Sequence, residues 1–147
     1  MNVYVTQEFI SEVKLISKDK AHSDCEMNII DSIFNKTIDE IKIIGTKRLG
    51  GQPDKSPFLR KRLGSENSGN SSGYRLYFWL FIFEENIYLL FIHPKTGRRS
   101  ATNITLEKQK ELVRTFKYCR DNNLFLEVNL DKKINKIVFK TTKKVVF

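Results

Sequence analysis

The 147-residue sequence has few of the features that identify metal centres, disulfide scaffolds or membrane proteins. Its two cysteines, Cys25 and Cys119, stand far apart, and no CxxC or Cys/His cluster offers metal-ligand spacing. We therefore expect reduced thiols, no metal and no cofactor. The longest apolar runs, residues 76–83 and 87–92, are too short to cross a bilayer, and no signal-peptide pattern opens the chain. These absences exclude a membrane span and favour a cytoplasmic protein.

The motifs of several large enzyme classes are also missing. The sequence has no HExxH, no GxSxG and no Walker loop, and no pair of carboxylates lies in one candidate loop. Zinc proteases, serine hydrolases and P-loop enzymes are therefore not indicated.

Positive charge is concentrated in the later part of the chain. Residues 1–45 carry five lysines against eight acidic residues, a net charge of −3, whereas the remaining 102 residues carry 21 basic against nine acidic residues, a net charge of +12. Such a field favours a polyanionic partner, because cations that neutralise phosphates release condensed counterions. A solvated face or a generally lysine-rich composition is the plain alternative.

Apolar periodicity predicts one α+β domain over residues 1–147. It is expected to have an N-terminal strand, two helices, a mainly antiparallel twisted sheet and a further C-terminal helix. The predicted strands cover residues 3–5, 58–63, 74–84, 87–93, 124–130 and 134–139, and the predicted helices cover residues 7–17, 23–41 and 106–122. Residues 124–147 form a C-terminal β-hairpin extension that could extend the sheet, contact RNA through its lysines, or be a solvated tail.

The residues most informative about function are basic, and they lie on or at the ends of predicted core strands. They form three groups: Arg60, Lys61 and Arg62; Arg75; and Lys95, Arg98 and Arg99. Neighbouring strands of one sheet could bring the three groups onto one surface.

Alternation along one strand makes this expectation more specific. Arg75, Tyr77 and Trp79 share one face of their strand, while Tyr74, Leu76 and Phe78 share the other. The same rule places Lys61 on the face opposite its two arginine neighbours, so the three cannot all serve one site. The plain reading of Arg75 is a structural arginine stacked on an aromatic ring.

The segment Ser71-Ser72-Gly73-Tyr74-Arg75-Leu76 follows a basic strand, residues 59–62, and precedes an apolar strand, residues 87–92, with Lys95 after it. In this order it resembles the RelE family of toxins from type II toxin-antitoxin systems, over residues 1 to about 121. The resemblance implies a RelE-like microbial RNase fold and ribosome-dependent cleavage of mRNA in the decoding A site. It also implies a cognate antitoxin that covers the basic face.

The reaction that the resemblance implies needs no metal: a ribose 2′-hydroxyl attacks the adjacent phosphate and leaves a cyclic phosphate. It requires a base, cations for the charge on the phosphorane, and an acid for the leaving 5′-oxygen. The expected catalytic residues are Lys61 as base, Arg75 as phosphate clamp, Arg98 or Arg99 beside the leaving group, and His93 as a candidate acid. The expected RNA-binding residues are Arg60, Arg62, Lys95 and Tyr77.

Two other functions stay open at the level of sequence. Residues 100–103 lack the tyrosine or histidine that several active members of the family carry there, so a non-catalytic RNA-binding or interaction module with the same fold is one alternative. The other is a ParE-like toxin, which shares the fold but inhibits DNA gyrase. A lone histidine at the end of a strand, such as His93, is more often a packing residue than an acid.

Overall fold

The computed structural model describes residues 1–64, 73–95 and 104–147, which form an α+β fold around a seven-stranded mixed sheet. No helix in these ranges is long and apolar enough to cross a membrane. In chain order the elements are β1 (Asn2–Val5), α1 (Gln7–Ser17), η1 (Lys20–His22), α2 (Cys25–Ile29), η2 (Ile30–Phe34), α3 (Ile38–Ile43), β2 (Thr46–Gln52), β3 (Ser56–Leu63), β4 (Tyr74–Phe81), β5 (Asn86–Pro94), α4 (Leu106–Asp121), β6 (Leu126–Asp131) and β7 (Lys136–Phe139).

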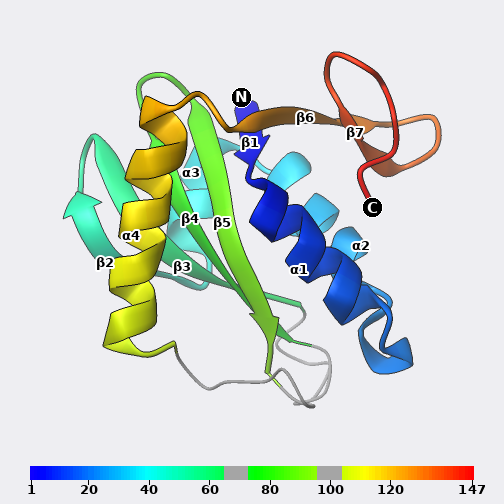
Figure 1. Cartoon of the computed structure of the whole chain (residues 1–147), viewed down its shortest axis with the longest axis horizontal. Helices are drawn as coiled ribbons and strands as arrows, with labels where there is room; N and C mark the ends of the chain where they lie inside the picture. The colour runs from blue at the N-terminus through cyan, green and yellow to red at the C-terminus, as the bar shows by residue number, and fades with distance from the viewer. Residues whose placement is uncertain (65–72, 96–103) are drawn as a thin grey trace.

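The strand order of the sheet is β2-β3-β4-β5-β1-β6-β7. Strands β2 to β5 form an antiparallel meander, and β1 lies between β5, to which it is parallel, and β6, to which it is antiparallel. The sheet is therefore mixed, with one parallel pair. The C-terminal hairpin, β6 and β7, extends the sheet through β1, as Figure 1 shows.

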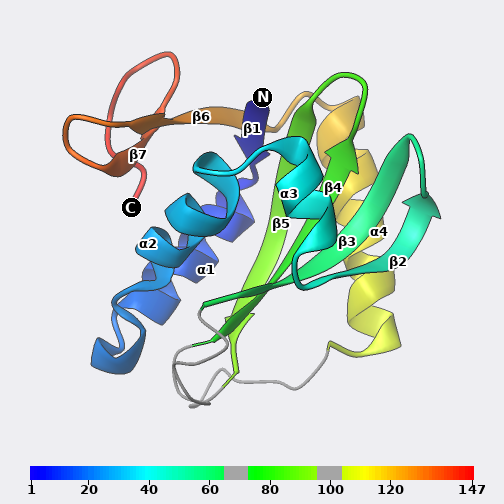
Figure 2. The ribbon, with the colours of Figure 1, turned by 180° about the vertical axis from the view of Figure 1, so that it is seen from behind.

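Helices cover both faces of the sheet (Figures 1 and 2). Helices α1, α2 and α3 pack on one face, where their apolar residues form one core with Tyr74, Leu76 and Phe78 of β4. Helix α4 packs on the other face, in a second cluster that contains Tyr77 and, at its margin, Trp79. The alternation predicted for β4 is thereby confirmed, and the face with Arg75 and Tyr77 is the α4 face.

The predicted helix over residues 23–41 is interrupted. A five-residue π-helix, η2, follows α2, and α3 begins anew after Thr37. Thr37 and Glu40 form a capping box, in which Thr37 Oγ1 accepts from the Glu40 N–H at 3.3 Å and Glu40 Oε1 accepts from the Thr37 N–H at 3.1 Å. The apolar spacing of Phe34, Ile38 and Ile41 continues across this break, which is why periodicity alone predicts one helix.

Strand β2 was not predicted from the sequence. Its register against β3 shifts between Arg48 and Gly50, and Gly51 has a φ of +73°. A Cβ atom on Gly51 would stand 2.3 Å from the Ser56 carbonyl oxygen, so this close approach of β2 and β3 needs glycine. The two glycines and the shifted register hide the strand pattern, yet β2 borders the candidate site.

Candidate functional site

Basic side chains from adjacent strands meet on the α4 face of the sheet. In the β3–β4 register Arg62 lies opposite Arg75 and Arg60 lies opposite Tyr77, and in the β4–β5 register Arg75 lies opposite His93. Residues directly opposite each other in an antiparallel pair point to the same face. The sheet therefore brings together Arg60, Arg62 and Arg75, which we call the arginine cluster.

The Arg75 guanidinium lacks a counter-charge in the described part of the chain. Its Nε and Nη1 atoms are buried and have no hydrogen-bond partner there. Burial, and then the charges of Arg60 and Arg62, hold the pKa of Arg75 below its ordinary value. Buried guanidinium nitrogens without hydrogen-bond acceptors are costly, and a bound anion would remove that cost. The arrangement therefore indicates an anion site.

Lys95, at the end of β5, adds a fourth cation to the arginine cluster. Its backbone N–H donates to the Gly73 carbonyl at 2.9 Å, and its side-chain stem packs over Gly73. Burial, and then the charges of Arg75 and Arg62, lower the pKa of Lys95. The proximity of Lys95 to the arginine cluster agrees with its predicted place in the site.

A buried pair of hydrogen-bonded side chains lies beside the arginine cluster, on the same face of the sheet. Tyr77 and His93 are 0 % and 3 % exposed, and the Tyr77 hydroxyl lies 3.0 Å from His93 Nε2. His93 Nδ1 lies 3.1 Å from the Pro94 carbonyl oxygen. Because a carbonyl oxygen can only accept, Nδ1 carries the proton and Nε2 accepts from Tyr77. The Ile104 backbone N–H also donates to the Tyr77 oxygen, which ties the chain just before α4 to the sheet.

Burial and these hydrogen bonds keep the His93 imidazole neutral and out of reach of a substrate. Burial lowers the pKa of His93, and the charges of Arg75 and Arg60 lower it further against the opposing effect of the Pro94 hydrogen bond. The geometry therefore gives His93 and Tyr77 a positioning role beside the arginine cluster and does not favour His93 as an acid that touches substrate.

Lys61 lies on the opposite face of the sheet, 4 % exposed. Its Nζ donates to the carbonyl of Ile44 and, at 3.5 Å, to that of Ile41, and the Thr46 hydroxyl donates to the same two oxygens. Lys61 thus caps the C-terminal end of α3, where a cation is favourable. Its predicted role as a base beside Arg75 does not fit this position. Arg98 and Arg99 lie outside the described residues.

Sequence reasoning missed Lys47, which β2 places opposite Arg60. A pocket of about 190 Å³ lies there, lined by Lys47, Leu49, Arg60, Tyr77, Ile104 and Gln109. We call it the cationic pocket. The sequence signal that could have revealed Lys47 is its spacing from Leu49, because residues two apart in a strand share one face; both precede the two glycines of β2.

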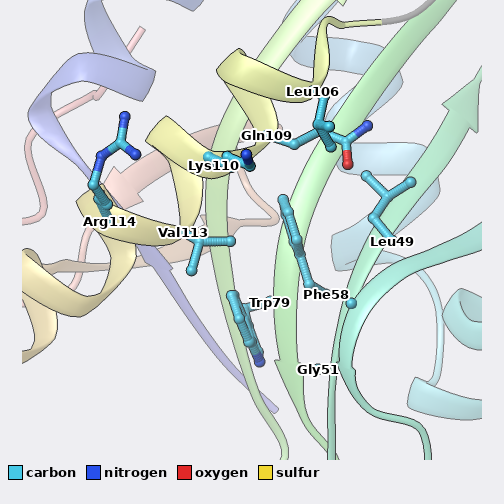
Figure 3. Close-up of a pocket in the computed structure, with 10 residues that line it drawn as sticks. Leu49, Gly51, Phe58, Trp79, Leu106, Gln109, Lys110, Val113 and Arg114 are labelled. Carbon is cyan, nitrogen blue, oxygen red and sulfur yellow. The ribbon is translucent and has the colours of Figure 1, made fainter.

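A second pocket, of about 450 Å³, lies between α4 and the strands (Figure 3). We call it the apolar pocket, and its lining residues are Leu49, Gly50, Gly51, Phe58, Trp79, Leu106, Gln109, Lys110, Val113 and Arg114. The Trp79 ring stacks with Phe58 at 5.1 Å and with Phe116 at 4.6 Å between ring centroids, so aromatic contacts hold the floor of this pocket in place.

Comparisons with known proteins add no assignment. No family model, no curated protein and no solved structure matches the chain. Within residues 1–64, 73–95 and 104–147, no group of three or more His, Cys, Asp or Glu side chains could hold a metal ion.

Proposed function

We propose that the protein is a ribosome-dependent mRNA endoribonuclease, the toxin component of a type II toxin-antitoxin system. The observation that carries the proposal is the Arg75 guanidinium, which has two buried nitrogens without hydrogen-bond partners among the described residues and lies among further cations. A phosphate group offers several strong acceptor oxygens to such a fork of donors. In support, β1, the helices, the basic strand β3, β4 with Arg75 and the apolar strand β5 follow one another in the order on which the RelE resemblance rests, with β2 added before β3.

The arginine cluster suits a reaction in which charge grows on one phosphate. The ribose 2′-oxygen bonds to phosphorus, the bond from phosphorus to the 5′-oxygen breaks, and a cyclic phosphate and a 5′-hydroxyl result. Arg75, with Arg60 or Arg62, stabilises the charged phosphorane. The base that accepts the 2′-hydroxyl proton is Lys95 and not Lys61, which was expected from the sequence. Lys95 suits this role because its pKa is lowered and it lies beside the arginine cluster.

The remaining parts of the proposal follow the resemblance. Help for the leaving 5′-oxygen is expected from Arg98 or Arg99. The substrate is mRNA in the ribosomal A site, and the partner that neutralises the toxin is an antitoxin that covers the basic face. The net charge of +12 on residues 46–147 supports an RNA-rich partner.

One observation favours a second candidate, a non-catalytic RNA-binding module. Lys61 lies on the far face of the sheet, and His93 and Tyr77 are buried. The described residues thus supply cations for phosphate binding but leave Lys95 as the one proton acceptor beside Arg75 that has a lowered pKa and is not buried. A chain in which Lys95 cannot act as a base would bind RNA without cutting it.

Mapping mRNA 5′-ends in bacterial cells after induction separates these functions. Wild type should produce new ends at codon positions, Arg75→Ala should produce none, and the exposed lysine variant Lys117→Ala should behave as wild type. Growth arrest with supercoiling defects and intact transcripts would overturn the proposal in favour of a gyrase inhibitor. Salt-sensitive RNA binding without new ends would favour the non-catalytic module.

A further inference from the structure

The cationic pocket and the apolar pocket adjoin each other. Leu49 of β2 and Gln109 of α4 line both. One ligand could therefore place a charged group beside Arg60 and Lys47 and an uncharged group against Phe58. Such a ligand must be anionic at one end and largely apolar at the other.

The walls of the apolar pocket define the uncharged group more closely. Figure 3 shows Leu49, Phe58 and Trp79 on the strand side and Leu106, Gln109 and Val113 on the α4 side. Apart from Trp79, Gln109 is the one uncharged polar side chain among the described lining residues, and its amide offers both donors and an acceptor. The volume of about 450 Å³ falls within the range of small-molecule sites, and aromatic contacts hold the floor of the pocket.

Charge selects the class of ligand. Lys110 and Arg114 line the apolar pocket on the α4 side, and Lys47 and Arg60 line the cationic pocket. None of the described residues that line either pocket is acidic. Both pockets therefore suit a chain with repeated negative charge. Together with the unpartnered nitrogens of Arg75 these cations favour phosphates over isolated carboxylates, because each phosphate accepts from several donors at once.

We propose that the apolar pocket accepts one unpaired nucleobase of the RNA strand whose phosphates lie on the arginine cluster and in the cationic pocket. Single-stranded RNA can turn a base out of its stack into a pocket with apolar and aromatic walls, where its edge is read by hydrogen bonds. Gln109 supplies those hydrogen bonds. The inference rests on the proposed function, because it places a base next to the phosphate that Arg75 would hold.

The experiment compares two non-cleavable RNA hexamers, one of 2′-fluoro adenosine and one abasic with the same number of phosphates. Trp79 is the only tryptophan of the chain and lines the pocket, so its fluorescence reports occupancy directly. We expect the adenosine hexamer to bind roughly five-fold to a hundred-fold tighter than the abasic hexamer and to change the Trp79 emission. Equal affinity of the two hexamers, with unchanged emission, would overturn the inference.

Two variants localise the effect. Val113→Phe fills the pocket and should remove the advantage of the adenosine hexamer while the abasic hexamer binds as before. Gln109→Leu keeps the side-chain volume and should reduce the differences in affinity among hexamers of the four bases. This variant still tests the site if Val113→Phe folds poorly. Lys117→Phe adds a ring on an exposed part of α4 and should change nothing. The site is refuted if Val113→Phe keeps the full preference for the adenosine hexamer over the abasic hexamer and Gln109→Leu keeps the full differences among hexamers of the four bases.

Failure of the inference and failure of the proposed function give different results. Binding of both hexamers that depends on Arg75 but ignores the base would refute the nucleobase site alone. Binding that survives Arg75→Ala would refute the phosphate site and, with it, the proposed function. If an acidic peptide with apolar side chains displaces no RNA yet changes Trp79 emission, the pocket belongs to a protein partner and the inference is wrong.

Discussion

Arg75→Met is expected to abolish RNA cleavage and to stabilise the fold, two effects of opposite sign from one substitution. Methionine keeps the apolar stem and removes the guanidinium, whose Nε and Nη1 atoms are buried without partners in the described structure. An unsatisfied buried polar group costs about 1–3 kcal/mol. Since the rest of the Arg75 side chain is half-buried and screened by solvent, we expect a gain of about 1 kcal/mol, or a rise in the thermal midpoint of about 2–4 °C.

Urea unfolding at neutral pH and low salt, without phosphate, measures this gain, and Lys117→Met is the control for removing an exposed charge. Inorganic phosphate should then stabilise wild type but not Arg75→Met, because a ligand that binds only the folded state adds RT ln(1 + [L]/Kd). A loss of stability of about 2 kcal/mol or more in Arg75→Met would mean that the guanidinium has a structural partner. That result would refute the argument for an anion site.

Three further substitutions test residues in the candidate site and on the opposite face of the sheet. Lys61→Ala should lower the free energy of unfolding by about 2 kcal/mol, measured with urea, because a buried stem and a donor to two α3 carbonyls are lost; unchanged stability would contradict its capping role. His93→Gln should flatten the loss of stability in acid. Because burial holds the pKa of His93 below 6.5, the unfolded chain takes up a proton that the folded chain does not, and stability falls as pH decreases from about 6.5; parallel urea midpoints for both proteins would refute this. Gly73→Ala should slow single-turnover cleavage with little change in stability, because its Cβ would stand 2.8 Å from Lys95 Cδ and displace that flexible side chain; an unchanged rate would argue against Lys95.

The facing of individual side chains could be predicted from the sequence, because it depends on local alternation. Arg75 and Tyr77 lie on the α4 face, and Tyr74 and Leu76 lie on the helix α1 face, as the period of two requires. The same rule separated Lys61 from its neighbours. The role given to Lys61 by resemblance conflicts with this facing, and the structure agrees with the alternation.

Contacts between strands could not be predicted, because register depends on residues far apart in the chain. Nothing in the local pattern of β3 or β4 shows that Arg62 lies opposite Arg75. The bulge in β5, where the register shifts between Tyr77 and Phe78 of β4, is likewise a property of the pair. Strand β2 could not be predicted because Gly50 and Gly51 interrupt its strand pattern. Lys47, which lies opposite Arg60 in the β2–β3 register, was therefore not predicted either.

The run Arg60-Lys61-Arg62 shows why basic composition alone does not locate a site. Alternation sends the middle cation to the helix-covered face, where carbonyl oxygens at the end of α3 satisfy its ammonium group. The outer two cations remain on the face of Arg75, where burial first and then their charges lower the pKa of its guanidinium, whose Nε and Nη1 atoms have no hydrogen-bond partner in the described part of the chain. Like charges held close together destabilise a fold, and such destabilisation concentrates at functional sites. Phosphate binding is therefore favoured by the buried Arg75 nitrogens, which lack hydrogen-bond partners among the described residues, and not by the number of basic residues.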